Sequence, residues 1–165
     1  MATSTAAELT VRRATEADVP ALLALRDLAV RAAYARLGDK AVAHWLAARN
    51  TEAWLSQRLG HPHGVLHVAA HGDSLVGCGF VRFDGAQAFL GDLYVQTPGR
   101  GIGSRLLDVR LELARSWGCA SAWCLAFAVN TGALRFLYAR GFTISGMTES
   151  DVVLGAIMFR HERAL

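Results

Sequence analysis

Residues Phe89–Leu107 read FLGDLYVQTPGRGIGSRLL, and this stretch decides how the rest of the chain is interpreted. A run of strand-forming residues enters a loop that holds Gly99, Gly101 and Gly103, and a helical pattern then begins. Glycines let backbone amides approach a ligand without interference from Cβ atoms. The start of a helix adds unpaired N–H groups and the positive end of the helix dipole. The stretch therefore predicts a site for a phosphate or pyrophosphate group.

The composition predicts a packed globular protein. Hydrophobic residues make up 53% of the 165 residues and charged ones 19%, which favours a single domain over 1–165, with 1–8 as a flexible lead-in. No apolar run is long enough to cross a membrane, and the N-terminus lacks the pattern of a secretory signal. Cys78, Cys119 and Cys124 lie in apolar stretches, as expected of reduced core thiols in the cytoplasm.

The basic residues are scattered along the chain. The net charge is +3, and sixteen of the seventeen basic residues are arginines that do not run together. A nucleic-acid partner is therefore not expected, and neither is a membrane partner.

Periodicity and turn residues predict a mixed α/β (α+β) domain. The three middle strands form an antiparallel meander, and the next strand lies parallel to the last of them because a helix crosses between the two. The sheet is thus mostly antiparallel and flanked by helices. The predicted strands are 9–14, 65–70, 75–83, 88–96, 122–128, 142–145 and 157–163, and the predicted helices are 19–37, 40–49, 51–59, 104–117 and 133–140.

Two common glycine-rich nucleotide sites do not fit. A P-loop requires a lysine directly after its last glycine, and the only lysine is Lys40. The dinucleotide-binding fingerprint requires a third glycine where this chain has Ser104 or Leu106. The fingerprint should also follow an early strand of a repeated βαβ unit, which the predicted order of elements does not contain.

Four stretches are interpreted together: VRRATEAD (Val11–Asp18), LVGCGFV (Leu75–Val81), LYV followed by RGIGSRLL (Leu93–Val95 and Arg100–Leu107), and NTGALRF followed by GF (Asn130–Phe136 and Gly141–Phe142). In this order they resemble the GNAT superfamily of N-acetyltransferases, over nearly the whole chain. The resemblance implies the acyl-CoA N-acyltransferase fold in one domain. It also implies direct transfer of an acetyl group from acetyl-CoA to a primary amine of a small molecule.

The resemblance implies a cofactor site in the opening stretch. Amides from Arg100 to Arg105 would hold the pyrophosphate of acetyl-CoA, and the pantetheine would lie beside the strand like an extra strand. Asn130 would contact the pantetheine arm or cap the helix, and both roles stay open. The expected cofactor-binding residues are Leu93, Tyr94, Val95, Gly99, Arg100, Gly101, Ile102, Gly103, Ser104, Arg105 and Asn130.

Two residues are candidates for acid–base work. Transfer to an amine needs a neutral nucleophile, donors for the oxyanion and an acid for the leaving sulfur. Asp92 is the candidate base, because burial beside the splayed sheet would raise its pKa; a structural Asp bonded to a neighbouring helix or loop is an equal alternative. Tyr138 is the candidate acid, although the family's tyrosine falls at Leu137, and one residue turns a helix by about 100°.

Three departures from the family pattern support a rival hypothesis. Gly91 stands where some members have a glutamate before the aspartate, and Leu137 stands where the tyrosine is expected. Pro98 removes an amide donor from a loop that looks about two residues short. These features favour a catalytically weak acyl-CoA-binding or regulatory protein with the same fold.

The helical region 26–54 is expected, by analogy with the family, to wall the acceptor pocket through Asp27, Tyr34 and Trp45. Asp27 could attract a cationic amine, or it could be an ordinary solvated carboxylate. The sequence does not identify the amine. A homodimer through the C-terminal strands stays open, because no residue indicates one.

No metal is expected. His61, His63, His67 and His71 look like a cluster, but the last two flank a strand and would lie about 13 Å apart at about 3.3 Å per residue.

Overall fold

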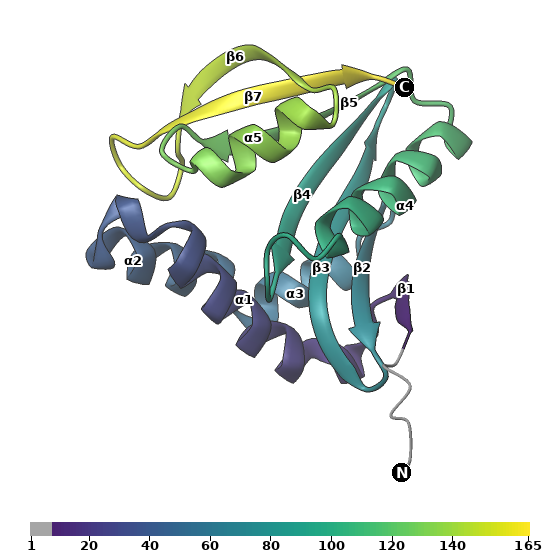
Figure 1. Cartoon of the computed structure of the whole chain (residues 1–165), viewed down its shortest axis with the longest axis horizontal. Coiled ribbons are helices and arrows are strands. Elements are labelled where there is room, and N and C mark those ends of the chain that lie inside the picture. Colours follow the sequence, from purple (N-terminus) through teal and green to yellow (C-terminus); the bar gives the residue numbers. More distant parts are fainter. Residues whose placement is uncertain (1–7) are drawn as a thin grey trace.

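The structure is a computed structural model that describes residues 8–165, so the predicted flexible segment 1–8 falls almost wholly outside the described residues. Within the described part, the chain forms one seven-stranded sheet in the order β1-β2-β3-β4-β5-β7-β6 with helices on both faces (Figure 1). The predicted fold class is confirmed. The strands are β1 (Leu9–Arg13), β2 (Gly64–His71), β3 (Ser74–Asp84), β4 (Gln87–Val95), β5 (Ser121–Phe127), β6 (Thr143–Glu149) and β7 (Ile157–Ala164).

The helices follow the predicted order. They are α1 (Val19–Ala33), α2 (Asp39–Arg49), α3 (Glu52–Leu59), α4 (Ile102–Ser116) and α5 (Thr131–Ala139), with short 3-10 turns at Glu16–Asp18 and Ala35–Leu37. The first predicted helix was expected to reach residue 37, but it ends at Ala33 and the chain continues as the second 3-10 turn. The helix after the glycine loop begins at Ile102, two residues earlier than predicted, directly at the loop.

The sheet separates in its middle. β4 and β5 are parallel, as predicted, but they pair only over Gln87–Phe89 with Ser121–Trp123. Beyond these residues the two strands diverge, as Figure 1 shows on the side away from the C-terminus. No strand of the described part of the chain therefore pairs with this edge of the diverging half of β4.

Alternation along the strands explains the two layers of helices. In β2, Leu66 and Val68 join the apolar cluster under α1, α2 and α3, whereas Val65 joins the cluster under α4. Successive strand residues point to opposite faces, so each strand contributes to both clusters. The helices α1–α3 thus cover one face, and α4 covers the other.

A bulge in β4 redirects one side chain. Cys78 pairs with Tyr94 and Phe80 with Gly91, so Asp92 and its neighbour stand opposite one residue of β3. Asp92 has φ 53°, and among the described residues it is the one non-glycine with a positive φ. Bulges of this kind re-aim a side chain. Here the carboxylate of Asp92 reaches α1 and α3.

None of the helices described within 8–165 has the length and apolar character needed to cross a membrane. All the described elements join the one sheet, and the extension of a single domain over 1–165 stays a prediction.

Candidate active site

Two cavities meet where β4 and β5 separate. The one we name the loop cavity has a volume of about 730 Å³ and lies along the end of β4, the glycine loop and the start of α5. The one we name the sheet cavity has a volume of about 510 Å³ and lies between α2, α3, β4, β5 and the β6–β7 connection. A ligand in the loop cavity can present one end to the sheet cavity. The residues that line both are Leu93, Tyr94, Asn130, Ala133 and Phe136.

The glycine loop supplies the donors of the loop cavity. Gly99 and Gly101 have φ of 79° and 76°, and a Cβ at either position would meet nothing within 4 Å. The chain therefore takes a left-handed turn there beside open space, which glycine permits without strain. α4 begins at once, and the first amides of a helix have no partner within it. Ile102, Gly103 and Ser104 line the loop cavity at this end, and their amides stay the candidates for binding a ligand.

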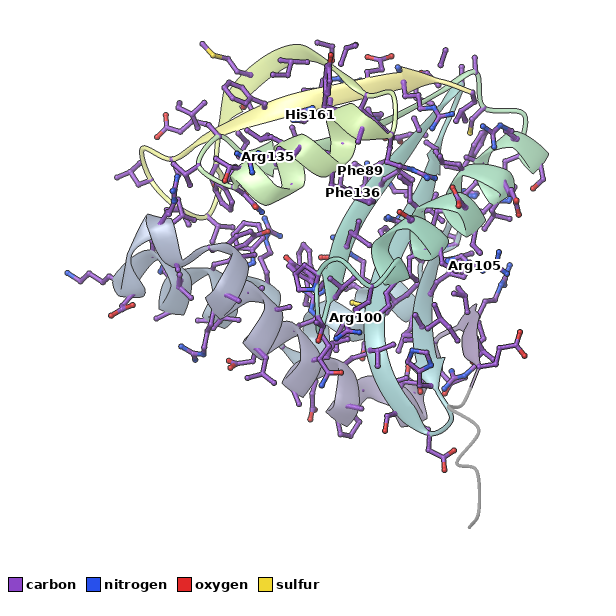
Figure 2. The ribbon with its side chains drawn as sticks, in the orientation of Figure 1. Phe89, Arg100, Arg105, Arg135, Phe136 and His161 are labelled. Atoms are coloured by element: carbon purple, nitrogen blue, oxygen red, sulfur yellow. The ribbon has the colours of Figure 1, made fainter. Side chains whose placement is uncertain are left out.

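The predicted set is too wide at its end. The amide of Arg105 donates to the carbonyl of Gly101 at 3.0 Å, so it is already used inside the helix. Neither Arg100 nor Arg105 lines the loop cavity, and Figure 2 shows Arg105 projecting from the outer side of α4. The amide of Arg105 is therefore not free to bind phosphate, and binding by the amides of the first helical turn stays a prediction.

Asn130 has the capping role that the sequence allowed. Its Oδ1 accepts a hydrogen bond from the amide of Ala133 at 3.2 Å, which starts α5. Asn130 also lines both cavities, so its role toward a ligand stays a prediction.

Asp92 is held in a buried ion-pair group. Its Oδ2 accepts from Nε of Arg58 at 2.8 Å, and its Oδ1 lies 3.2 Å from Nη1 of Arg26. Burial alone would raise the pKa of Asp92, but the two guanidinium groups outweigh burial and lower it. The prediction of a raised pKa for Asp92 is wrong. The sequence does not show that Arg26 and Arg58 lie beside this carboxylate in the fold. The alternative of a structural aspartate bonded to neighbouring helices is the one the contacts favour.

Tyr138 faces away from the cavities. Its side chain is 80% exposed, and it lines neither cavity. Leu137 is buried and lines the sheet cavity instead. The position of Tyr138 does not support its predicted role as acid, because one residue of helical rotation carries its hydroxyl to the solvent side.

The sequence did not show that Tyr34 and Tyr94 form a hydrogen-bonded pair. The hydroxyl oxygens of Tyr34 and Tyr94 lie 3.3 Å apart although the residues are 60 positions apart in the sequence. Burial raises the pKa of both phenols, so they stay protonated and can donate hydrogen bonds near neutral pH. Tyr94 lines both cavities, and Tyr34 lines the sheet cavity. No local sequence signal joins two residues so far apart.

The predicted pocket residues separate. Tyr34 and Trp45 line the sheet cavity, and their rings meet edge to face with centroids 5.4 Å apart. Asp27 lines neither cavity and instead pairs with Arg31, one turn along α1. Its predicted place in the pocket is therefore corrected.

The sheet cavity has arginine and aromatic walls that the sequence did not single out. The arginines among its lining residues are Arg49, Arg58, Arg82 and Arg110, and the aromatic residues include Trp54, Phe89, Trp123 and Phe136. Figure 2 shows Phe89 of β4 and Phe136 of α5 projecting into the space between these elements.

Arg110 is the most deeply placed of these arginines. Its Nη1 donates to the carbonyls of Phe80 and Gly91 at 3.1 and 3.2 Å, and its Nε donates to the carbonyl of Leu106. None of the ion pairs among the described residues includes Arg110. Burial lowers the pKa of Arg110 to about 10, so the group remains charged at neutral pH.

The cysteines are core residues. Burial raises the pKa of Cys78 to about 11 and that of Cys124 to about 12, so neither is a thiolate at neutral pH. Among residues 8–165, no group of three or more His, Cys, Asp or Glu side chains could hold a metal ion.

Comparison with known proteins agrees with this geometry. A family model described as "Acetyltransferase (GNAT) family" matches residues 22–142. A comparison with curated protein sequences gives no significant match.

Solved structures share the fold. The PaiA N-acetyltransferase from Thermoplasma acidophilum, solved in complex with coenzyme A, superposes with a TM-score of 0.82 at 16% identity, over 96% of this chain and 99% of that one. A GCN5-related N-acetyltransferase structure from Rhodopseudomonas palustris gives 0.81 at 20% identity, over 99% and 100%. The ribosomal-protein-S18-alanine N-acetyltransferase from Escherichia coli gives 0.73 at 14%, over 95% and 94%.

Proposed function

The chain belongs to the acetyltransferase (GNAT) family, and from this premise we propose that it transfers an acetyl group from acetyl-CoA directly to the primary amine of a small molecule. The observation that carries the proposal is the meeting of the loop cavity and the sheet cavity at five shared residues. The loop cavity takes the coenzyme, and the sheet cavity takes the amine. We expect the reaction in the cytoplasm, without a metal or a nucleic-acid partner.

The loop cavity fits a pyrophosphate and an extended amide-rich arm. The turn at Gly99 and Gly101 leaves open space, and the first amides of α4 can donate to phosphate oxygens. The free edge of β4 at Leu93 and Val95 can pair with the pantetheine amides, as an added strand would.

The reaction needs few ionisable groups. The lone pair of the neutral amine attacks the thioester carbonyl, the resulting oxyanion collapses, and the C–S bond breaks to release the coenzyme thiolate. The amine loses one proton, and the thiolate gains one. The Tyr34 and Tyr94 hydroxyls are the donors we propose for the developing charge. Cys78 and Cys124 are neutral thiols, which agrees with transfer without an acyl-enzyme.

The arginines near the point where β4 and β5 separate assist removal of the amine proton. Arg26 and Arg58 flank Asp92, and Arg110 lies at the carbonyl of Gly91. An ammonium that enters such a site loses its proton more easily, because nearby positive charge lowers its pKa. Water can then carry the proton away, and Asp92 serves to position β4.

A catalytically weak acyl-CoA-binding protein is the second candidate. Leu137 occupies the inward position where the family has a tyrosine, and the carboxylate of Asp92 is tied to two arginines. Both observations remove a common acid–base group from the site.

Calorimetry with acetyl-CoA and a thiol-release assay over an amine panel separate the two candidates. Thiol release with at least one amine supports the enzyme. Binding of acetyl-CoA without release on any amine supports the weak binder, and no binding contradicts both.

One variant locates the coenzyme. Ser104→Glu adds a carboxylate beside the helix amides, where it suits the helix dipole but repels phosphate, so acetyl-CoA affinity should fall by about tenfold or more. Ser56→Glu on the exposed face of α3 is the matched control, because Ser56 lines neither cavity. Equal affinity in both variants would place the coenzyme elsewhere.

A further inference from the structure

Arg49 bridges the mouth of the sheet cavity. It is the last residue of α2, and its guanidinium lies over the indole of Trp54, with the central carbon 4.2 Å from the ring centroid. It forms an ion pair with Asp151, which lies in the connection between β6 and β7. All three residues line the sheet cavity.

The carboxylate of Asp151 is easily replaced. Its side chain is 75% exposed, whereas that of Arg49 is 21% exposed. An ion pair with so exposed a partner contributes little to stability. A guanidinium held over an aromatic ring is restrained, and its forked donors suit two-point binding of a carboxylate. Asp151 therefore occupies the place that a carboxylate of a ligand can take.

The inner wall of the sheet cavity has excess positive charge. Arg58 and Arg110 line it, Arg26 lies buried behind it, and the carboxylate of Asp92 is shared by Arg26 and Arg58. Nearer the solvent, Arg82 is paired with Asp84, and Glu149 accepts a hydrogen bond from the amide of Gly155. A ligand whose sole charge is an ammonium would meet this inner wall without compensation, whereas one that carries a carboxylate balances it.

Trp45 lies between Arg49 and the junction of the two cavities. Arg49 lies one helical turn, about 5.4 Å, beyond Trp45, whose ring packs on Tyr34. The Tyr34 hydroxyl in turn meets that of Tyr94, at the junction with the loop cavity. The indole of Trp45 offers an apolar wall between Arg49 and the junction, whereas the ring of Trp54 already carries the guanidinium groups of Arg49 and Arg58.

We infer that the amine acceptor is an amino acid with a flat apolar side chain, whose carboxylate binds Arg49 in place of Asp151. This inference rests on the proposed function, since it names the acceptor of the same site. The exchange of Asp151 for the ligand forms one ion pair and releases another, so the Asp151 carboxylate becomes free in solvent.

Calorimetry on the protein saturated with coenzyme A tests the inference with tryptophan and tryptamine, which differ by the carboxylate. Tryptophan should bind at least about tenfold more tightly than tryptamine. Arg49→Gln should abolish this preference. Asp151→Asn should increase tryptophan affinity, because it removes the competing carboxylate. A merely damaged fold would not give these opposite effects.

Arg31→Gln is the matched control, because it removes a guanidinium from an exposed Arg–Asp pair on α1 that lies outside both cavities. It should leave both affinities unchanged. The inference is overturned if tryptamine binds as tightly as tryptophan, if neither binds, or if Asp151→Asn weakens tryptophan binding.

Thiol release from acetyl-CoA distinguishes the proposed acetyl transfer from the assignment of an amino acid as the acceptor. Release with tryptamine and not with tryptophan leaves the proposed function standing and overturns the acceptor assignment. Preferential binding of tryptophan that depends on Arg49, without release on any amine of the panel, contradicts the transfer reaction and leaves the carboxylate site in place.

Discussion

The Nε of Arg58 donates to Oδ2 of Asp92 at 2.8 Å and so ties α3 to the bulge of β4. Arg26 of α1 approaches the other carboxylate oxygen, and its remaining nitrogens donate to Oδ1 of Asn50 and to the carbonyl of Arg49. One carboxylate thus joins two helices to the strand that lines both cavities. The conformation of β4 where it separates from β5 depends on this buried ion-pair group of Asp92, Arg26 and Arg58.

Asp92→Asn should destabilise the fold strongly. Removing one member of a buried ion-pair group leaves charged guanidinium groups without compensation, which costs about 3–5 kcal/mol. Urea unfolding followed by circular dichroism measures the change in the free energy of unfolding. Asp27→Asn, which breaks an exposed pair on α1, should cost less than about 1 kcal/mol. Comparable losses in the two variants would show that the buried group is not structural.

Acid should destabilise the protein through depressed carboxylates. The hydrogen bond from Arg12 lowers the pKa of Asp18 to about 2, and Arg26 and Arg58 lower that of Asp92. In the unfolded chain an aspartate titrates near about 3.9. The unfolded state therefore binds more protons in this range, so the stabilisation is present above about pH 4 and is lost as the pH falls toward the folded pKa.

Urea unfolding at about pH 6, 4 and 3 checks this sign. The wild-type free energy of unfolding should fall steadily across the series. Arg12→Gln should be less stable than wild type at the highest pH, and the difference should narrow at the lowest, because Asp18 then contributes less in both proteins. A difference that is constant with pH would contradict the assignment of the low pKa to Arg12.

Tyr94→Phe and Tyr34→Phe should each lower kcat by on the order of tenfold to a hundredfold, because they remove donors from the junction of the cavities. Tyr138→Phe should leave kcat unchanged, since that hydroxyl lies in solvent. Steady-state kinetics with the best amine of the panel gives the comparison. Loss of activity in Tyr138→Phe alone would restore the acid that the sequence suggested.

The sequence could predict roles that a residue performs toward its own neighbours in the chain. Gly101 next to the start of α4, and Asn130 at the start of α5, act through their own neighbours, so their roles follow from spacing. The surroundings of Asp92 and Tyr138 do not favour their predicted catalytic roles, for a different reason. The pKa of Asp92 depends on arginines 34 or more positions away, and Tyr138 misses the cavity by one step of helical rotation.

The sheet cavity was the least predictable part. Arg49 and Asp151 are 102 positions apart, and Tyr34 and Tyr94 are 60 apart. The β6–β7 connection brings Asp151 to Arg49, and the packing of α1 on β4 brings Tyr34 to Tyr94. Composition showed many arginines but not that four of them line one cavity.

Gly79→Ala tests whether Arg110 can move. A Cβ at Gly79 would lie 2.9 Å from Cζ and Nε of Arg110, and that guanidinium is held by the carbonyls of β3, β4 and α4. Displacing the guanidinium leaves buried donors unpaired, so we expect the free energy of unfolding to fall by about 1–3 kcal/mol.

Gly146→Ala on the exposed strand β6 is the matched control, because its Cβ meets nothing within 4 Å. Since alanine restricts the unfolded chain more than glycine does, this control should be neutral or more stable by up to about 1 kcal/mol. Urea midpoints of the two variants decide the question, and equal midpoints would mean that the Arg110 side chain adjusts freely.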